Sequence, residues 1–147
     1  MRIVLVDDNW ACLDAMSYVL ETLGHTCLRF KHPRTALAAI ANAENECDAV
    51  ITDYAMPEQN GLQLAREIRG LRATLPIVMC SGVVTEEEFC AQGAGECCVF
   101  LRKPVEAEEL RAVLAKVASG ASSVPTGALQ KGTPPAGRQK AKSRLGQ

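Results

Sequence analysis

Four short apolar runs, each ending close to a polar or charged residue, constrain the fold of this sequence more than any other feature. They are residues 3–6 before Asp7 and Asp8, residues 49–52 before Asp53, residues 76–80 before Ser81, and residues 98–101 shortly before Lys103. Runs that are apolar almost throughout are typical of parallel strands buried on both faces of a sheet. Because ligands bind at the carboxyl edge of such sheets, we expect three carboxylates, a hydroxyl and an ammonium group to meet there.

Helical patterns fill the segments between the apolar runs. We expect strands at residues 2–6, 26–30, 48–52, 76–80 and 97–101, with helices at about 10–23, 33–42, 61–70 and 106–118 and a short one after Thr85. In the third helix, Leu64, Ile68 and Leu71 recur at three- and four-residue spacing, which predicts one buried face. Strict alternation of strand and helix indicates an α/β fold, a doubly wound five-stranded parallel sheet flanked by five helices.

Composition narrows the class of protein. The sequence is 48% hydrophobic and 22% charged, as in an ordinary soluble globule. No apolar run approaches the roughly 20 residues that a membrane span needs, and the first residues do not form a signal peptide, so we expect a cytoplasmic protein. The seven cysteines include no C-x-x-C pair, which argues against a disulfide framework or a zinc site.

The charge distribution separates a body from a tail. Residues 1–118 contain 11 basic and 17 acidic side chains, a net charge of −6, whereas residues 119–147 contain five basic side chains and no acid. The second segment is rich in Gly, Pro and Ser and has few large apolar residues, so we expect one domain at 1–118 and a disordered basic tail at 119–147. Such a tail is either a solvated extension or an arm that binds a polyanion or an acidic partner.

The polar groups expected at the sheet edge favour metal-assisted phosphoryl chemistry. An isolated Asp-Asp pair is often a turn and a helix cap, but Asp53 holds the same place on another strand. Clustered carboxylates raise each other's pKa, and Mg²⁺, which prefers oxygen ligands, removes that conflict. With Lys103 and Ser81 nearby, a phosphoryl group would find charge and hydrogen-bond partners, and Asp53 would serve as the nucleophile.

Four motifs in order resemble the receiver domains of two-component response regulators over about residues 1–118. They are Val6-Asp7-Asp8-Asn9, Asp53-Tyr54-Ala55-Met56-Pro57 followed by Gly61, Ser81-Gly82, and Lys103-Pro104. The resemblance implies a flavodoxin-like sheet with strand order 2-1-3-4-5. It also implies a phosphoprotein in signal transduction that catalyses only its own phosphorylation and dephosphorylation and is otherwise not an enzyme.

The same resemblance assigns roles to individual residues and implies partners. The roles are Asp53 as phosphoacceptor, Asp7, Asp8, Asp53 and the Ala55 carbonyl as Mg²⁺ ligands, Lys103 as the phosphoryl's cation, and Ser81 and Phe100 as the switch. The implied phosphodonor is a histidine kinase or a histidine phosphotransfer protein, and the surface of the fourth helix, fifth strand and fifth helix would signal to a downstream protein target. No DNA-binding domain and no membrane attachment are expected.

Three alternatives remain from the residues. A phosphatase of the haloacid-dehalogenase type also forms an aspartyl phosphate, but its nucleophile lies on the first strand within D-x-D, and a cap domain has no room here. A nucleotide-binding module lacks support because neither G-x-x-x-x-G-K nor G-x-G-x-x-G follows the first strand. A degenerate receiver that binds partners without phosphorylation is disfavoured by the complete set of acids, Lys103 and Ser81.

Overall fold

The computed structural model describes residues 1–42, 44–93 and 98–120, so most of the predicted tail and the predicted first residue of the fifth strand, Cys97, lie outside the described residues. Strands and helices alternate along the chain, as the sequence predicts. The elements are β1 (Arg2–Val6), α1 (Trp10–Thr22), β2 (Thr26–Phe30), α2 (Pro33–Ala41), β3 (Ala49–Asp53), α3 (Gly61–Leu71), β4 (Ile77–Ser81), α4 (Glu86–Ala91), β5 (Val99–Arg102) and α5 (Ala107–Ala118).

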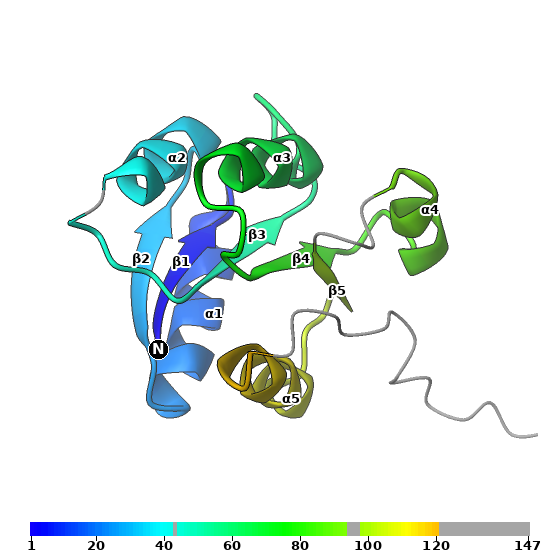
Figure 1. The fold of residues 1–147 in the computed structure, drawn as a ribbon. Helices are drawn as coiled ribbons and strands as arrows, with labels where there is room; N and C mark the ends of the chain where they lie inside the picture. Colours follow the sequence, from blue (N-terminus) through cyan, green and yellow to red (C-terminus); the bar gives the residue numbers. More distant parts are fainter. Residues whose placement is uncertain (43, 94–97, 121–147) are drawn as a thin grey trace, which may run out of the picture.

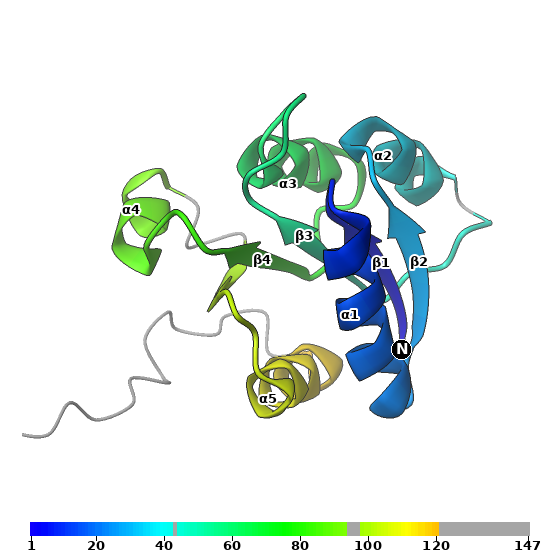
Figure 2. The same ribbon diagram turned by 180° about the vertical axis from the view of Figure 1, so that it is seen from behind.

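The strands form one parallel sheet in the order β2-β1-β3-β4-β5, which confirms the predicted doubly wound fold. Helices α1 and α5 cover one face of the sheet, and α2 and α3 cover the other (Figures 1 and 2). Helix α4 lies beyond β4 and is set apart from α3 in both views. The parallel register pairs Val6 with Thr52 and Asp53 with Cys80, so the carboxyl ends of the central strands lie at one edge.

Alternate residues of the central strands feed two cores, one on each face of the sheet. On one face, Val4, Val50 and Met79 pack with α2, α3 and Phe89 of α4. On the other face, Leu5 and Val78 pack with α1 and α5. Burial on both faces explains why β1, β3 and β4 are apolar almost throughout their length.

Side-chain caps fix where several helices begin. The Asn9 side chain accepts a hydrogen bond from the amide of Ala11 at the start of α1. Asn60 with Gln63, and Thr85 with Glu88, form reciprocal capping boxes at the starts of α3 and α4. The Thr85 box lies where the sequence predicts the start of a short helix, and each cap satisfies amides that would otherwise lack partners.

Strand boundaries and one buried position differ from the sequence predictions. Strand β5 covers Val99–Arg102 and leaves out Cys98, although a strand was predicted at 97–101. Strands β3 and β4 begin and end one residue later than predicted, so Asp53 and Ser81 are the last strand residues rather than the first residues beyond. The prediction that Leu71 is buried is wrong, since Leu71 is 52% exposed. Helix α3 ends at Leu71, and the chain turns so that Leu75 enters the core in its place.

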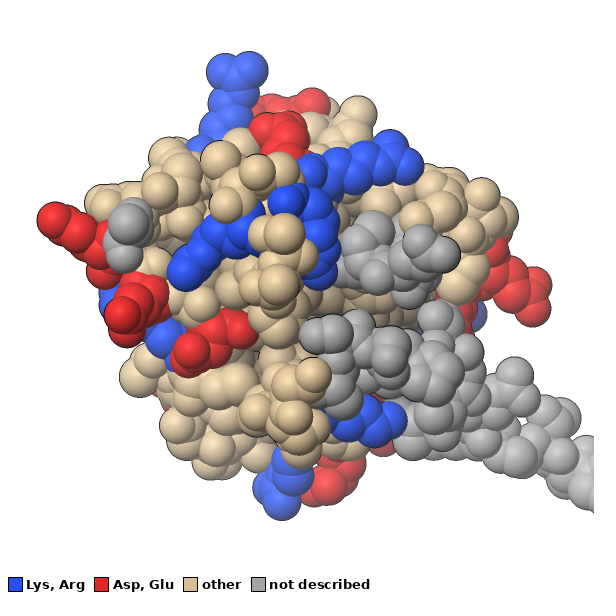
Figure 3. All heavy atoms as spheres, in the orientation of Figure 1, with Lys and Arg blue, Asp and Glu red and all other residues tan. Residues whose placement is uncertain are grey.

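The surface mixes both signs of charge. Basic and acidic side chains are interspersed on the face shown in Figure 3. Within the described residues, no helix is long and apolar enough to cross a membrane. The six cysteines in the described part of the chain are free thiols.

Candidate functional site

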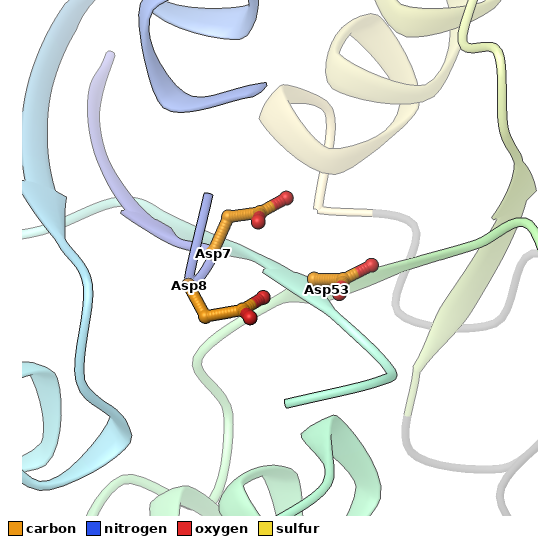
Figure 4. Close-up of side chains that lie close together, drawn as sticks. All are labelled: Asp7, Asp8 and Asp53. Atoms are coloured by element: carbon orange, nitrogen blue, oxygen red, sulfur yellow. The ribbon is translucent and has the colours of Figure 1, made fainter. Parts of the chain in front are cut away.

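Three aspartates gather at the carboxyl edge of the sheet. Asp7 and Asp8 directly follow β1, and Asp53 ends the neighbouring strand β3. One carboxylate oxygen from each lies within 4.8 Å of one from every other member of the group. Figure 4 shows the three side chains next to one another at the ends of these strands. Parallel pairing of β1 with β3 is therefore what brings together acids that are more than 40 residues apart in the sequence.

Lys103 joins this group from the segment after β5. Its Nζ lies 2.8 Å from Oδ1 of Asp53 and 3.0 Å from Oδ2 of Asp7. The Lys103 amide donates to the carbonyl of Ser81 at 2.8 Å, which fixes the backbone from which the side chain reaches back. The peptide bond between Lys103 and Pro104 is cis. One ammonium group thus bridges two of the three carboxylates.

Burial and neighbouring charges shift the proton affinities of the bridged pair. Burial raises the pKa of Asp53, the hydrogen bond and charge of Lys103 oppose that rise, and the charges of Asp7 and Asp8 add to it. For Lys103, burial lowers the pKa, but the hydrogen bonds to Asp53 and Asp7 together with the negative charges of these two residues outweigh burial and raise it. Lys103 therefore remains a cation at physiological pH, and its positive charge is shared by the carboxylates of Asp7 and Asp53.

A small cavity of about 40 Å³ lies beside the carboxylates, between α1 and the sheet. Asp7, Asp53 and Lys103 line it together with apolar side chains and the thiols of Cys12 and Cys80. Burial raises the pKa of Cys80 to about 12. The Cys80 thiol is consequently neutral and behaves as a small apolar group next to the acids.

Backbone hydrogen bonds and close packing fix the chain around Asp53. The amide of Tyr54 donates to the carbonyl of Cys80 at 2.9 Å, and the amide of Gly61 donates to the carbonyl of Tyr54 at 2.8 Å. A Cβ atom at Gly61 would lie 2.3 Å from the Asp53 carbonyl oxygen and 2.5 Å from the sulfur of Met79. Only glycine allows α3 to begin this close to the end of β3.

The Ser81 hydroxyl and the Phe100 ring both have partners outside the acidic group. Ser81 is buried, and its Oγ accepts hydrogen bonds from the amides of Val83 and Val84, at 3.2 and 3.0 Å. Phe100 is half-buried, and its ring centroid lies 5.2 Å from that of the fully buried Phe89. Ser81 therefore contacts the loop before α4, and Phe100 contacts α4 itself.

The rim of the site contains contacts that the sequence did not reveal. Trp10 is the first residue of α1, directly after the segment that holds Asp7 and Asp8, and Nζ of Lys31 lies 5.7 Å from its ring centroid. The Tyr54 hydroxyl donates to Oε1 of Gln92 at 3.1 Å, and Nη2 of Arg66 donates to the Gln92 carbonyl at 3.3 Å. These partners lie 38 and 26 residues apart, and no local sequence signal marks them.

The described geometry supplies what phosphoryl chemistry requires. Three carboxylates offer oxygen ligands and a nucleophile, and one ammonium group offers a partner for added negative charge. Ala55 is exposed in the loop after β3, two residues beyond Asp53. Val83, two residues beyond Ser81, is 73% exposed.

Comparisons with known proteins agree on one family. Residues 3–115 match the family model described as the response regulator receiver domain. The chain is 32% identical over 112 residues to a two-component response regulator of Arabidopsis thaliana, ARR10, covering 76% of this chain and 20% of that protein. It is 35% identical over 122 residues to the sensory/regulatory protein RpfC of Xanthomonas campestris pv. campestris, covering 80% of this chain and 16% of that one.

A solved structure extends the agreement to three dimensions. The response regulator receiver domain protein from Clostridium thermocellum matches with a TM-score of 0.74 and 25% identity, covering 80% of this chain and 94% of that one. The chain thus spans about a fifth or less of the curated relatives named above but nearly all of this solved domain. With its acids, lysine and serine at the sheet edge, the chain belongs to the response regulator receiver domain family.

Proposed function

We propose that this receiver accepts a phosphoryl group on Asp53 from a phosphohistidine donor in a two-component phosphorelay. The single observation behind the proposal is the group formed by Asp7, Asp8 and Asp53 with Lys103 bound to two of them. A nucleophile, oxygen ligands and a cation for the transferred group meet in one place, at the edge where ligands bind in this class of fold.

The donor set fits Mg²⁺. All available ligands are oxygens, which hard divalent cations prefer, and three carboxylates face one ammonium group, which leaves an excess of negative charge. Burial and the two neighbouring acids raise the pKa of Asp53, which is the sign of a site that favours added positive charge. The side chains of Asp7, Asp8 and Asp53 and the carbonyl of Ala55 would hold the ion. When bound, it would neutralise charge on the carboxylates and on the incoming phosphoryl oxygens.

The transfer step needs no large rearrangement of Asp53 or Lys103. A carboxylate oxygen of Asp53 forms a bond to phosphorus while the bond from phosphorus to the donor's imidazole nitrogen breaks, and the leaving nitrogen takes up a proton from solvent. Lys103 already lies 2.8 Å from Asp53, so its ammonium group can follow the phosphoryl charge without a large movement. The buried Asp53 backbone, held by Gly61 and Tyr54, orients the nucleophile.

Phosphorylation would be signalled through Ser81 and Phe100. Ser81 would turn its hydroxyl toward the new phosphoryl oxygens. Phe100 would then move inward into the space that Ser81 leaves. Because Ser81 bonds to the amides of Val83 and Val84 and Phe100 packs on Phe89, both movements would alter the surface around α4, β5 and α5.

The family supports partners of a known class. A histidine kinase or a histidine phosphotransfer protein would be the donor, and a downstream protein would bind the altered surface. We assign the receiver to residues 1–118 and a basic tail to 119–147, and we place the protein in the cytoplasm. The competing hypothesis is a degenerate receiver, which would bind its partners without phosphorylation.

Intact mass measurement separates the two hypotheses. The protein is incubated with acetyl phosphate, with and without Mg²⁺, and its mass is compared with that of Asp53→Asn and of the matched control Asp14→Asn, a carboxylate on α1 that pairs with Arg29. We expect one added phosphoryl group that requires Mg²⁺, persists in Asp14→Asn and is lost in Asp53→Asn. No gain under any condition would favour the degenerate receiver.

A further inference from the structure

The two ends of α4 are both held by residues that adjoin the acidic site. Before its first residue, the Ser81 hydroxyl accepts hydrogen bonds from the amides of Val83 and Val84, which lie in the loop that leads into α4. At its end, Gln92 receives hydrogen bonds from the Tyr54 hydroxyl and from Arg66. Tyr54 directly follows Asp53, so the phosphoacceptor has a Tyr54–Gln92 connection to α4 besides the one through Ser81.

We propose that the Tyr54–Gln92 hydrogen bond, assisted by Arg66, is a tether that restrains α4 and slows phosphorylation of Asp53. The proposal rests on the proposed function of Asp53 and concerns how that site is regulated. Tyr54 and Gln92 act as positioning residues, since neither touches the transferred group.

The tether opposes the movement that Ser81 would have to make. For Ser81 to reach a phosphoryl group on Asp53, its oxygen must either leave the amides of Val83 and Val84 or draw that loop with it. The loop leads into a helix of six residues, so the beginning of α4 cannot shift far without moving its end. Gln92 would then pull against Tyr54 and Arg66.

Among the described residues, which leave out 94–97 just after the helix, few other contacts hold α4 in place. Phe89 alone among the α4 side chains is buried, where it contacts Phe100. The helix packs on β5 and stands apart from α3 (Figures 1 and 2). Arg66 reaches across from α3 to the Gln92 carbonyl, so the tether joins two helices whose ribbons are well separated. The hydrogen bonds of Tyr54 and Arg66 to Gln92 are therefore a large share of what fixes the end of α4 within the described part of the chain.

Population shift gives the sign and size of the effect. If phosphorylation favours a displaced α4, the labelling rate follows the fraction of molecules in which α4 is already displaced. A net hydrogen bond corresponds to a change of roughly two- to tenfold in such an equilibrium. Loss of the tether should raise the labelling rate by that factor and should not lower it.

Variants that change one atom group isolate the tether. Tyr54→Phe removes only the hydroxyl, and Gln92→Met removes the acceptor, while Gln92→Glu keeps an acceptor oxygen. Tyr18→Phe is the matched control, because Tyr18 is 73% exposed on α1. Two measurements are made on each: amide hydrogen exchange over residues 86–92 without a phosphodonor, and the initial rate of labelling by acetyl phosphate with Mg²⁺.

We expect Tyr54→Phe and Gln92→Met to exchange faster in α4 and to label roughly two- to tenfold faster, with Gln92→Glu and Tyr18→Phe close to wild type. Labelling of Tyr54→Phe at or below the wild-type rate overturns the tether, whatever the exchange shows. Unchanged exchange in α4 overturns it as well. If the wild-type protein takes up no phosphoryl group, the proposed function fails and the regulatory role of the tether fails with it. If the wild-type protein is labelled but Tyr54→Phe has no effect, only the tether fails.

Discussion

The close approach of Gly61 to Asp53 allows a quantitative test of how the site is built. In Gly61→Ala the new Cβ would lie 2.3 Å from the Asp53 carbonyl oxygen and 2.5 Å from the Met79 sulfur, where ordinary contacts begin at 3.4 Å. The Met79 side chain can adjust, but the carbonyl belongs to a buried central strand. Relief of the overlap therefore requires the start of α3 and the end of β3 to separate by about 1 Å, the difference between 2.3 and 3.4 Å.

Overpacking of a buried site destabilises proteins by roughly 1–3 kcal/mol. Because the backbone of β3 has to move, we expect Gly61→Ala to lie near the upper end, at about 3 kcal/mol. For a domain of this size that loss corresponds to a fall in melting temperature on the order of 10 °C. Gly70→Ala is the matched control: it lies in the same helix, nothing lies within 4 Å of its Cβ position, and helix propensity favours alanine.

Urea unfolding followed by circular dichroism gives both free energies of unfolding. The expected pattern is a loss of about 3 kcal/mol in Gly61→Ala and no loss, or a gain of up to about 0.5 kcal/mol, in Gly70→Ala. Labelling of Asp53 should also slow in Gly61→Ala alone, since the nucleophile's own carbonyl is displaced. A Gly61→Ala protein within about 0.5 kcal/mol of wild type would refute the inferred contact between α3 and the end of β3.

Two further variants test the core and the electrostatics. Phe89→Ala should lower the free energy of unfolding by about 3–5 kcal/mol in the same assay, because the side chain is fully buried against Phe100, and a loss below about 1 kcal/mol would contradict that packing. Asp53→Asn should gain stability relative to wild type as pH rises. Burial is the main cause that raises the pKa of Asp53 above its ordinary 3.8, so the folded state binds the proton more tightly than the unfolded state does. The wild-type protein therefore loses this contribution to its stability as the Asp53 carboxyl ionises, whereas the Asn variant has no such contribution to lose. Urea unfolding of both proteins from pH 3.5 upward measures the difference, and parallel pH profiles would argue against the raised pKa.

Much of the fold was predictable because its signals are local. Apolar runs mark strands that are buried on both faces, and capping residues such as Thr85 mark helix starts within four positions of sequence. The gathering of Asp7, Asp8 and Asp53 follows from these local signals plus one global rule, that parallel strands place their carboxyl ends together. Once the elements were placed, the edge that holds the acids was determined.

The remaining features depend on contacts between distant segments. Leu71 has the spacing of a buried residue, but it is exposed because α3 ends there and Leu75 fills the core instead. Ser81 was predicted at the sheet edge, yet the direction of its hydroxyl depends on the amides of the loop that follows. The Tyr54–Gln92 hydrogen bond spans 38 residues and involves two exposed polar groups, for which sequence periodicity gives no signal.

The length of α4 explains why those distant contacts matter at this site. Isolated helices shorter than about 12 residues are marginal in water, and α4 has six residues. Its position therefore follows from what holds it: Ser81 before its first turn, Phe89 in the core, and Tyr54 with Arg66 at its end. Ser81 is the last residue of β4, the strand that pairs with the end of β3, and Tyr54 directly follows Asp53. A change of charge at Asp53 would therefore affect the residues that hold α4, the shortest helix of the described chain. We expect the surface around α4 to respond first.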